Sequence, residues 1–546
     1  MTITRRELLR RVSALGLASF TSTGVVACVA KTADTDTESG TDGTETDGDG
    51  LPEYEYDGDP GPEDMFTHGV ASGDPLADSV ILWTRVRPDQ VDAAVFFEVA
   101  RDPEFTERVA ADYVAAAADR DATVKLDVSG LEPATTYYYR FMAAGRASPI
   151  GRTRTAPTEA ERLRFAVCSC SNYAFGYFHA YKHMAARADL DAVLHLGDYI
   201  YEFGDGEYGE LRPLDPPYEV LTLDDYRRRY ARYREDQALS EAHRQHPFIV
   251  IWDDHETANN SYKDGAENHD DDTEGPWPDR RSAGTRAFFE WLPIREGAEG
   301  VIYRALPYGG LVDLIMLDTR LAGRDKQTNT PSTQEDPDRQ LLGEAQEAWL
   351  KSQFEGSTAT WRLLGQQVMV APWRSGAAIF NNDQWDGYVA ARARLFDMID
   401  ALPEPKNVVI LTGDLHSSWA TDVPRDGVPY DPQTGAGSLA VEFVTPAITS
   451  PGLLGSPEFI ELVRESNPHV RWVDFDKRGY VLLDVTAERL QADFFHVQGV
   501  TSMALDDEFF AAGFAVESGK SWITPVGMPA PPPADPPPLA PMPPPK

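Results

Sequence analysis

Four short polar blocks, each placed after an apolar run with the pattern of a buried strand, constrain this chain more than any other feature. Every block contains oxygen, nitrogen or sulfur donors that can bind a metal ion. Mixed donors at several strand ends favour a hydrolytic centre that holds more than one metal. The blocks are Cys168-Ser169-Cys170, His195 to Glu202 (HLGDYIYE), Trp252 to Glu256 (WDDHE) with Asn259-Asn260, and Thr412 to Ser418 (TGDLHSS).

The region that contains the blocks alternates between strand and helix patterns. This alternation predicts an α/β domain (α+β for the whole chain) with a mainly buried sheet. In such sheets, sites form at the carboxyl ends of strands, and all four blocks fall there. Strands are predicted over 163–167, 192–196, 248–252, 311–317, 361–367 and 408–412, and helices over 177–187, 223–237, 342–354 and 389–399.

The preceding region, 64–155, alternates apolar and polar residues with a period of two. Short strands with turns between them, over 79–86, 94–100, 123–128 and 136–141, predict a small all-β sandwich. The stretch 130–139 resembles fibronectin type III domains, which gives an architecture and no activity.

Both ends of the chain differ in composition from the middle. Residues 1–30 have the pattern of an export signal, with Arg5-Arg6 in a twin-arginine motif and Cys28 in a lipobox. A simple cleaved signal, with Cys28 incidental, is the alternative. The acidic tract 31–63 predicts a disordered tether. The segment 499–546 ends in a proline-rich tail that we expect to be extended or disordered, and the pattern leaves open whether 505–514 forms a helical lid.

Charge and cysteine content exclude some classes of protein. The 546 residues have a formal net charge of -38, so basic groups that neutralise nucleic-acid phosphates are scarce. Three cysteines are too few for a disulfide framework.

Individual residues in the blocks suggest particular roles. Asp198 follows a strand through a glycine, and its two oxygens could bridge two cations. Asp254 suits a hard cation, and its neighbour His255 could bind a metal or donate a proton to a leaving group. Asp414 and His416 are two residues apart, so in an extended segment both side chains point to one side, where each could serve one metal of a pair.

Together the blocks resemble the PhoD-like alkaline phosphatases of the calcineurin-type metallophosphoesterase superfamily. Phe66 to Pro75 (FTHGVASGDP) and Leu82 to Arg85 (LWTR) resemble the start of that family's N-terminal sandwich, and the likeness covers about 64–497. The resemblance implies a four-layer αββα metallophosphoesterase sandwich over 160–498, preceded by the small fibronectin/Ig-like sandwich.

The resemblance also implies the metals and their ligands. Members of the family carry ferric iron (Fe3+) and calcium (Ca2+). One departure concerns the first block, where the family commonly has Ser-Cys-Gln and this chain has Ser169-Cys170-Ser171 with Cys168 upstream. By motif match, Fe3+ would be held by Cys170, Asp198, Tyr201 and His416, Ca2+ would face Asp198, Asp254, Asn259 and Asp414, and a second Ca2+ would be held by Glu442, unless Glu442 is a surface carboxylate at a strand end.

The expected function is that of an exported, metal-dependent phosphoester hydrolase that uses metal-activated water. In this scheme His255 serves the leaving group and Asp198 bridges the metals. The expected partners are a phosphomonoester or phosphodiester substrate, including lipids, the twin-arginine export machinery, and a membrane through a lipid anchor at Cys28. This places the protein in the periplasm or at the cell surface. A phosphodiesterase or phospholipase D-type activity is the first alternative, and a non-catalytic surface-binding lipoprotein is the second.

Overall fold

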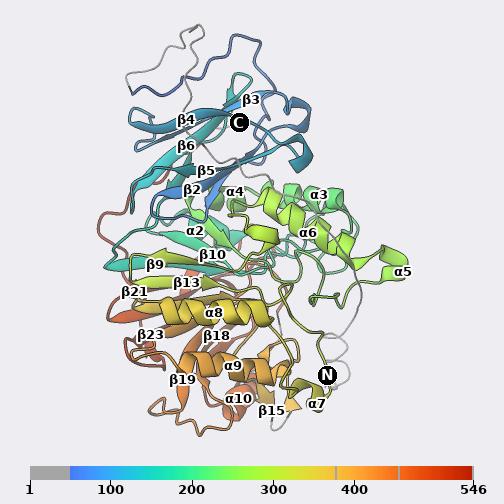
Figure 1. Ribbon diagram of the computed structural model, residues 1–546, viewed down its shortest axis with the longest axis vertical. Coiled ribbons are helices and arrows are strands. Elements are labelled where there is room, and N and C mark those ends of the chain that lie inside the picture. The colour runs from blue at the N-terminus through green and yellow to red at the C-terminus, as the bar shows by residue number, and fades with distance from the viewer. Residues whose placement is uncertain (1–48, 376–377, 453–454, 544–546) are drawn as a thin grey trace.

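Two β-sheets stacked face to face form the centre of the molecule, and helices cover their outer faces (Figure 1). The computed structural model describes residues 49–375, 378–452 and 455–543. The predicted export signal and Cys28 therefore lie outside the described residues. Within that described part, no helix is both long enough and apolar enough to cross a membrane.

The larger sheet has ten strands, and three parallel strands near its middle carry the first three polar blocks. Apart from the first residue of one of them, all residues of these three strands are buried, which is typical of a sheet covered on both faces. In order across the sheet, the strands are β24 (Thr524–Val526), β23 (Glu508–Glu517), β22 (Arg489–Val497), β21 (Arg478–Thr486), β9 (Arg162–Cys168), β10 (Ala192–His195), β11 (Pro247–Val250), β1 (Val70–Gly73), β2 (Ser79–Arg85) and β5 (Thr123–Ser129).

The second sheet has seven strands and carries the fourth block. Its order is β12 (Arg304–Tyr308), β13 (Val312–Met316), β14 (Trp361–Gln366), β17 (Val408–Thr412), β19 (Ser438–Val444), β18 (Ser418–Pro424) and β20 (Val470–Asp474). Strands β13, β14, β17 and β19 are parallel to their neighbours in that series. Contacts such as the edge-on pair of Phe165 and Tyr308, with ring centroids 5.1 Å apart, join the two sheets.

Helices complete the four layers. One apolar core lies between the sheets and extends under α2 (His179–Ala185), α3 (Leu223–Arg234), α4 (Gln237–Gln245) and α6 (Trp277–Trp291). A second core lies under α8 (Glu344–Gly356), α9 (Val389–Asp400) and α10 (Pro457–Ser466). Short elements in the connections are α5 (Asp271–Glu274), α7 (Pro331–Gln334), β15 (Arg374–Ser375) and β16 (Ala378–Ile379). The predicted αββα architecture is confirmed.

The N-terminal region is a sandwich, as predicted, but one of its sheets is continuous with the ten-stranded sheet. A five-stranded sheet packs over β1, β2 and β5 through a separate apolar core. Strand β1 in turn pairs in parallel with β11, with Ser72 opposite Pro247 and Gly73 opposite Phe248. The sandwich is therefore built onto the larger sheet. Its five strands are β3 (Ala94–Ala100), β4 (Arg108–Ala115), β6 (Thr136–Ala143), β7 (Arg146–Ala147) and β8 (Gly151–Arg154).

The acidic tract differs from the expected tether in its second half. Arg108 forms ion pairs with Asp49 at 2.9 Å and with Glu53 at 2.8 Å, and the Tyr54 hydroxyl accepts a hydrogen bond from the Gly145 amide at 2.7 Å. Residues 49–63 thus lie against the sandwich, because its basic and backbone groups provide partners for acidic and aromatic side chains. The prediction of a disordered tether is therefore wrong for residues 49–63.

The C-terminal segment first adds strands to the ten-stranded sheet and then crosses the molecule. Residues 508–517 form β23, which pairs with β22, so they are a strand and not a helical lid. The proline-rich residues 528–543, here called the C-terminal strap, are extended and run back to the sandwich, where Figure 1 marks the C-terminus near β3. Tyr138 donates to the Pro538 carbonyl at 2.8 Å and Arg244 to the Pro541 carbonyl at 3.0 Å.

Candidate metal centre

The four polar blocks meet just beyond the carboxyl ends of β9, β10, β11 and β17. Cys170 follows β9, Asp198 follows β10, Asp254 follows β11, and Asp414 follows β17 of the second sheet. Because both sheets present these ends on the same side, the blocks form one cluster of donors, as the sequence predicts.

Unusual backbone conformations aim the donor side chains. Cys170, Asp198, Asp414 and His416 have φ values of 63°, 54°, 59° and 51°, all in the left-handed region. Each such residue costs about 1–3 kcal/mol, and these conformations gather at functional sites. Gly197 has a φ of 104°, and a Cβ there would lie 2.4 Å from the Asp253 Cβ, so only glycine lets the second and third blocks approach this closely.

The first group of donors combines a thiol, a carboxylate and an imidazole. Donor atoms of Cys170, Asp198 and His416 lie within 4.8 Å of one another. The Tyr201 hydroxyl joins them, because it donates to Asp198 Oδ2 at 2.7 Å and lies 3.0 Å from His416 Nε2. This is the complete set that the resemblance assigns to iron. Cys170 is fully buried, and its burial and then the charge of Asp198 raise the pKa of the thiol well above its usual value.

Carboxylates dominate the other two groups. Among the described residues, Asp198, Asp254 and His255 form one further group, and Asp253, Asp254 and Asp414 form another. Burial raises the pKa of Asp254 to about 6, although Arg320 and His255 act in the opposite direction. So many buried carboxylates carry a cost that a bound cation would remove.

One oxygen atom of Asp198 directly supports the binding of a cation by this cluster. Asp198 Oδ1 is buried and has no hydrogen-bond partner, whereas Oδ2 accepts from Tyr201. A buried carboxylate oxygen without a partner is costly unless a ligand binds it. Because Asp198 belongs to two of the groups, its two oxygens are placed to serve two cations.

His255 is held in place by a buried carboxylate, that of Glu202, at the Nδ1 atom of its ring. Its Nδ1 lies 2.6 Å from Glu202 Oε2, and Glu202 is fully buried. Burial alone would lower the pKa of His255, but the charges of Glu202, Asp254 and Asp198 outweigh it and raise the pKa well above its usual value. These neighbours favour the protonated imidazole, and its Nε2 is not engaged by Glu202, which suits a proton donor.

Asn259 and Asn260 contact the site mainly through their backbone amides. The Asn259 amide N–H donates to Glu202 Oε1 at 2.7 Å, and the Asn260 N–H donates to Asp254 Oδ2 at 2.5 Å. The Asn260 side-chain amide is occupied by Glu267 at 2.6 Å. The turn thus orients Glu202 and Asp254, and Asn259 stays a predicted ligand by its side chain.

Glu442 and Cys168 lie apart from the donors. Glu442 is fully buried, so it is not a surface carboxylate, and it accepts hydrogen bonds from the amides of Val370 at 2.9 Å and Ala371 at 2.7 Å and from the Thr412 hydroxyl at 2.6 Å. These hydrogen bonds attach the chain after β14 to Glu442. Because they already engage the carboxylate, they give no support to a second calcium at Glu442. Cys168 is the last residue of β9 and, within the described residues, takes no part in the three groups.

Three further residues belong to the site although the sequence predicts no role for them, and one of these, Glu256, lies within the third block. Glu256 accepts from the amides of Asp198, Tyr199 and Asp253 at 3.1, 2.6 and 2.9 Å and so joins two blocks. The Tyr208 hydroxyl lies 3.3 Å from His416 Nδ1. Arg320 donates to Asp414 at 2.7 Å. Arg320 follows β13, and its position after a fifth strand end is the one signal that could have found it.

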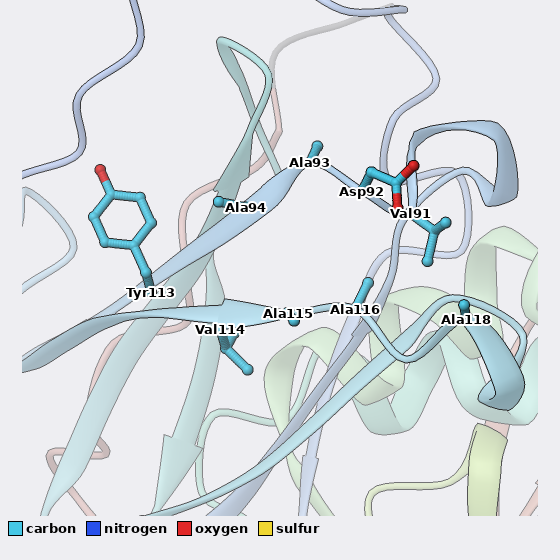
Figure 2. Close-up of a pocket in the computed structure, with 9 residues that line it drawn as sticks. All are labelled: Val91, Asp92, Ala93, Ala94, Tyr113, Val114, Ala115, Ala116 and Ala118. Carbon is cyan, nitrogen blue, oxygen red and sulfur yellow. The ribbon is translucent and has the colours of Figure 1, made fainter.

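A cavity in the sandwich is separate from this centre. Figure 2 shows it at the end of the β3–β4 pair, where residues 91–94, 113–116 and Ala118 line it. Its volume is about 460 Å³. It offers one carboxylate, Asp92, among alanine and valine side chains and Tyr113, so it lacks the donors that gather at the strand ends.

Comparison with known proteins shows the family to which this chain is similar. A family model for the PhoD-like phosphatase matches residues 165–494, and one for the N-terminal domain of PhoD-like phosphatases matches residues 55–157. The chain is 39% identical over 459 residues to alkaline phosphatase D of Bacillus subtilis (strain 168), which covers 79% of this chain and 77% of that protein. A solved structure described as that of PhoD is similar with a TM-score of 0.79 and 36% identity, covering 87% of this chain and 94% of that one.

Proposed function

Because the chain belongs to the PhoD-like phosphatase family and is a phosphoric ester hydrolase, we propose that it hydrolyses phosphoesters at a centre of ferric iron and calcium. The observation that carries this proposal is the meeting of two kinds of donor around Asp198. It shares one group of donors with a thiol, a phenol and an imidazole, and a second group with Asp254 and His255.

The donor types support the assignment of the two metals. Thiolate and phenolate are electron-rich ligands that favour an oxidised transition metal, so Cys170, Asp198, Tyr201 and His416 would hold Fe3+. Carboxylate and amide oxygens suit a hard cation, so Asp198, Asp254, Asn259 and Asp414 would face Ca2+. When bound, these cations supply the positive charge that the transition state of a phosphoester requires and activate water for attack.

The protein's own residues supply the proton and the alignment. His255 would protonate the leaving oxygen, and Glu202 keeps the imidazole charged and oriented through the 2.6 Å contact at Nδ1. Glu256 fixes the backbone of the second and third blocks relative to each other, so that Asp198 and Asp254 stay at a set separation.

Colour and metal content test the assignment. We expect the purified protein to contain iron and calcium and to absorb visible light through charge transfer from Cys170 and Tyr201. Cys170→Ser should remove much of the iron and change the absorption, whereas Cys168→Ser is the matched control, since that buried thiol lies outside the donor groups. A parent that is colourless and free of iron, yet fully active, would refute the iron site.

A substrate panel separates the possible reactions at the same site. The proposal predicts turnover of phosphomonoesters, and the panel should include a phosphodiester and a phospholipid. Faster turnover of the diester or the phospholipid would replace the monoesterase by a phosphodiesterase or phospholipase D-type activity. No turnover of any phosphoester by metal-replete protein would leave only the surface-binding lipoprotein.

We further propose that the protein is exported by the twin-arginine route and anchored through a lipid on Cys28, in the periplasm or at the cell surface. The support is the Arg5-Arg6 motif and the lipobox, which ends at Cys28. Cys28→Ala should move the protein from the membrane fraction to the soluble fraction after a high-salt wash. An unchanged membrane fraction would contradict the anchor.

A further inference from the structure

Arg320 lies at the centre of a ring of aspartates beside the donor groups. Its side chain is fully buried. Its Nε donates to Asp253, its Nη1 lies 2.8 Å from Asp383 Oδ2, and its Nη2 lies 2.7 Å from Asp414 Oδ1. A fourth carboxylate, that of Asp254, is 3.6 Å from Nη2. One guanidinium therefore touches or approaches all three members of the carboxylate group that could hold a cation.

Further polar side chains brace this ring of aspartates. Arg324 and Gln327 both donate to Asp383 Oδ1, and this fixes the carboxylate that contacts Arg320 Nη1. Gln384 Nε2 donates to Asp414 Oδ2 at 2.6 Å. Both oxygens of Asp414 thus have a donor, and each still has a lone pair that can face a cation.

The shape of the guanidinium explains why this position needs arginine. Its N–H groups lie in one plane at fixed angles, so contacts with three aspartates set the direction of each carboxylate. A lysine ammonium would provide the charge without these directions. Arg320 also compensates only part of the charge, since four carboxylates surround it, and the remaining negative charge still attracts a cation.

We propose that Arg320 is a positioning residue that orients Asp253, Asp254 and Asp414 for a bound cation. The inference rests on the proposed function only in requiring that these carboxylates bind a metal. Arg320 itself touches neither metal nor substrate, and acts through the side chains that it holds.

Metal binding measured on three variants tests this role. Arg320→Lys keeps the charge and Arg320→Met removes it, while Arg392→Met is the matched control, because Arg392 is equally buried and pairs with Asp386 and Asp426, which belong to none of the donor groups among the described residues. The readouts are metal content after dialysis, the dissociation constant for calcium, and near-ultraviolet circular dichroism as a check on folding. Loss of an orienting partner of this kind weakens metal binding by about 10–100-fold.

We expect Arg320→Lys to fold, to bind calcium at least about tenfold more weakly, and to regain turnover when calcium is in excess. Arg392→Met should keep the calcium affinity of the parent. Unchanged affinity in folded Arg320→Lys, or an equal loss in Arg392→Met, would overturn the inference.

Asp383→Asn provides a second route should an Arg320 variant not fold. Asp383 contacts Arg320 and belongs to none of the three donor groups among the described residues, so its variant should weaken calcium binding in the same direction. Unchanged calcium affinity in this variant would argue against Arg320 as the orienting group. A parent that binds no metal at all would instead contradict the proposed function.

Discussion

Asp198 is the residue on which the centre depends most directly, because it belongs to two of the three donor groups. Asp198→Asn keeps the size of the side chain and removes the charge that two cations would share. We expect turnover to fall by about a hundredfold or more and bound metal to decrease, since charge stabilisation is the main contribution of such a site. Elemental analysis and steady-state kinetics measure both effects. Asp112→Asn, at an exposed position of β4, should change neither. Near-normal activity in metal-replete buffer would contradict the bridging role.

His255 makes a different prediction, because a proton donor matters most for poor leaving groups. His255→Asn should slow the hydrolysis of alkyl phosphates by about 10²–10⁴-fold and that of 4-nitrophenyl phosphate much less. Glu202→Gln should produce a smaller effect of the same kind, since it loosens the imidazole without removing it. Rates for a series of leaving groups with different pKa values measure this dependence. Equal losses across the series would mean that His255 does not donate the proton.

At this scale the sequence identifies the donors well and their supports poorly. Cys170, Asp198, Tyr201, Asp254, Asp414 and His416 follow strand ends in recognisable blocks, so their meeting could be expected. Glu442 also follows the family pattern, but its backbone partners after β14 depend on tertiary structure that no local pattern encodes. The same holds for Arg320, whose partners come from three distant segments.

Each helix or strand that the sequence predicts is present with the predicted type, but the sequence does not predict which strands pair with one another. The predicted strand over 79–86 corresponds to β2, but the joining of β1 to β11 could not be foreseen, because parallel pairing across the intervening chain leaves no periodic signal. The predicted helix over 223–237 corresponds to α3, which ends at Arg234, and a second helix, α4, begins at Gln237. Asp236 caps the second, accepting from the amides of Ala238 at 2.9 Å and Leu239 at 3.1 Å, and this polar cap marks the break.

Gly73 tests the junction between β1 and β11. A Cβ at this position would lie 2.2 Å from the Pro293 carbonyl oxygen and 2.4 Å from that of Phe248, both of them backbone atoms. Gly73→Ala should therefore lower the free energy of unfolding by about 1–3 kcal/mol, as expected for overpacking. Gly356→Ala is the control, because nothing lies within 4 Å of its Cβ position. Chemical denaturation measures the difference, and equal stability of the two variants would show that the junction can yield.

For the whole molecule, the C-terminal strap contributes contacts that composition alone does not reveal. A proline-rich tail is expected to be extended, but whether it packs depends on donors elsewhere in the fold. Here Arg152 and Arg244, both buried, donate to the carbonyls of Pro537 and Pro541. Because proline has no backbone N–H, a proline-rich segment cannot pair its own backbone in a helix or sheet, and its carbonyl oxygens remain available to donors elsewhere in the fold.

Removing the strap, by ending the chain after Gly527, should destabilise the protein without emptying the metal centre. Hydrogen bonds to charged groups contribute about 1.5–3 kcal/mol each, so we expect a loss of about 3 kcal/mol or more. Calorimetry should show a lower unfolding temperature, while metal content and turnover at low temperature stay close to those of the full chain. A variant as stable as the parent would mean that the strap contacts contribute nothing.

The return of the strap to the sandwich also bears on how such proteins can exchange parts. Tyr138 and Pro538 are 400 residues apart in the chain yet share a hydrogen bond. A chimera that takes its sandwich from one relative and its last residues from another would bring together two surfaces that did not evolve together. Recombination within this family is therefore expected to succeed when both ends are inherited from one parent and the exchanged piece is internal.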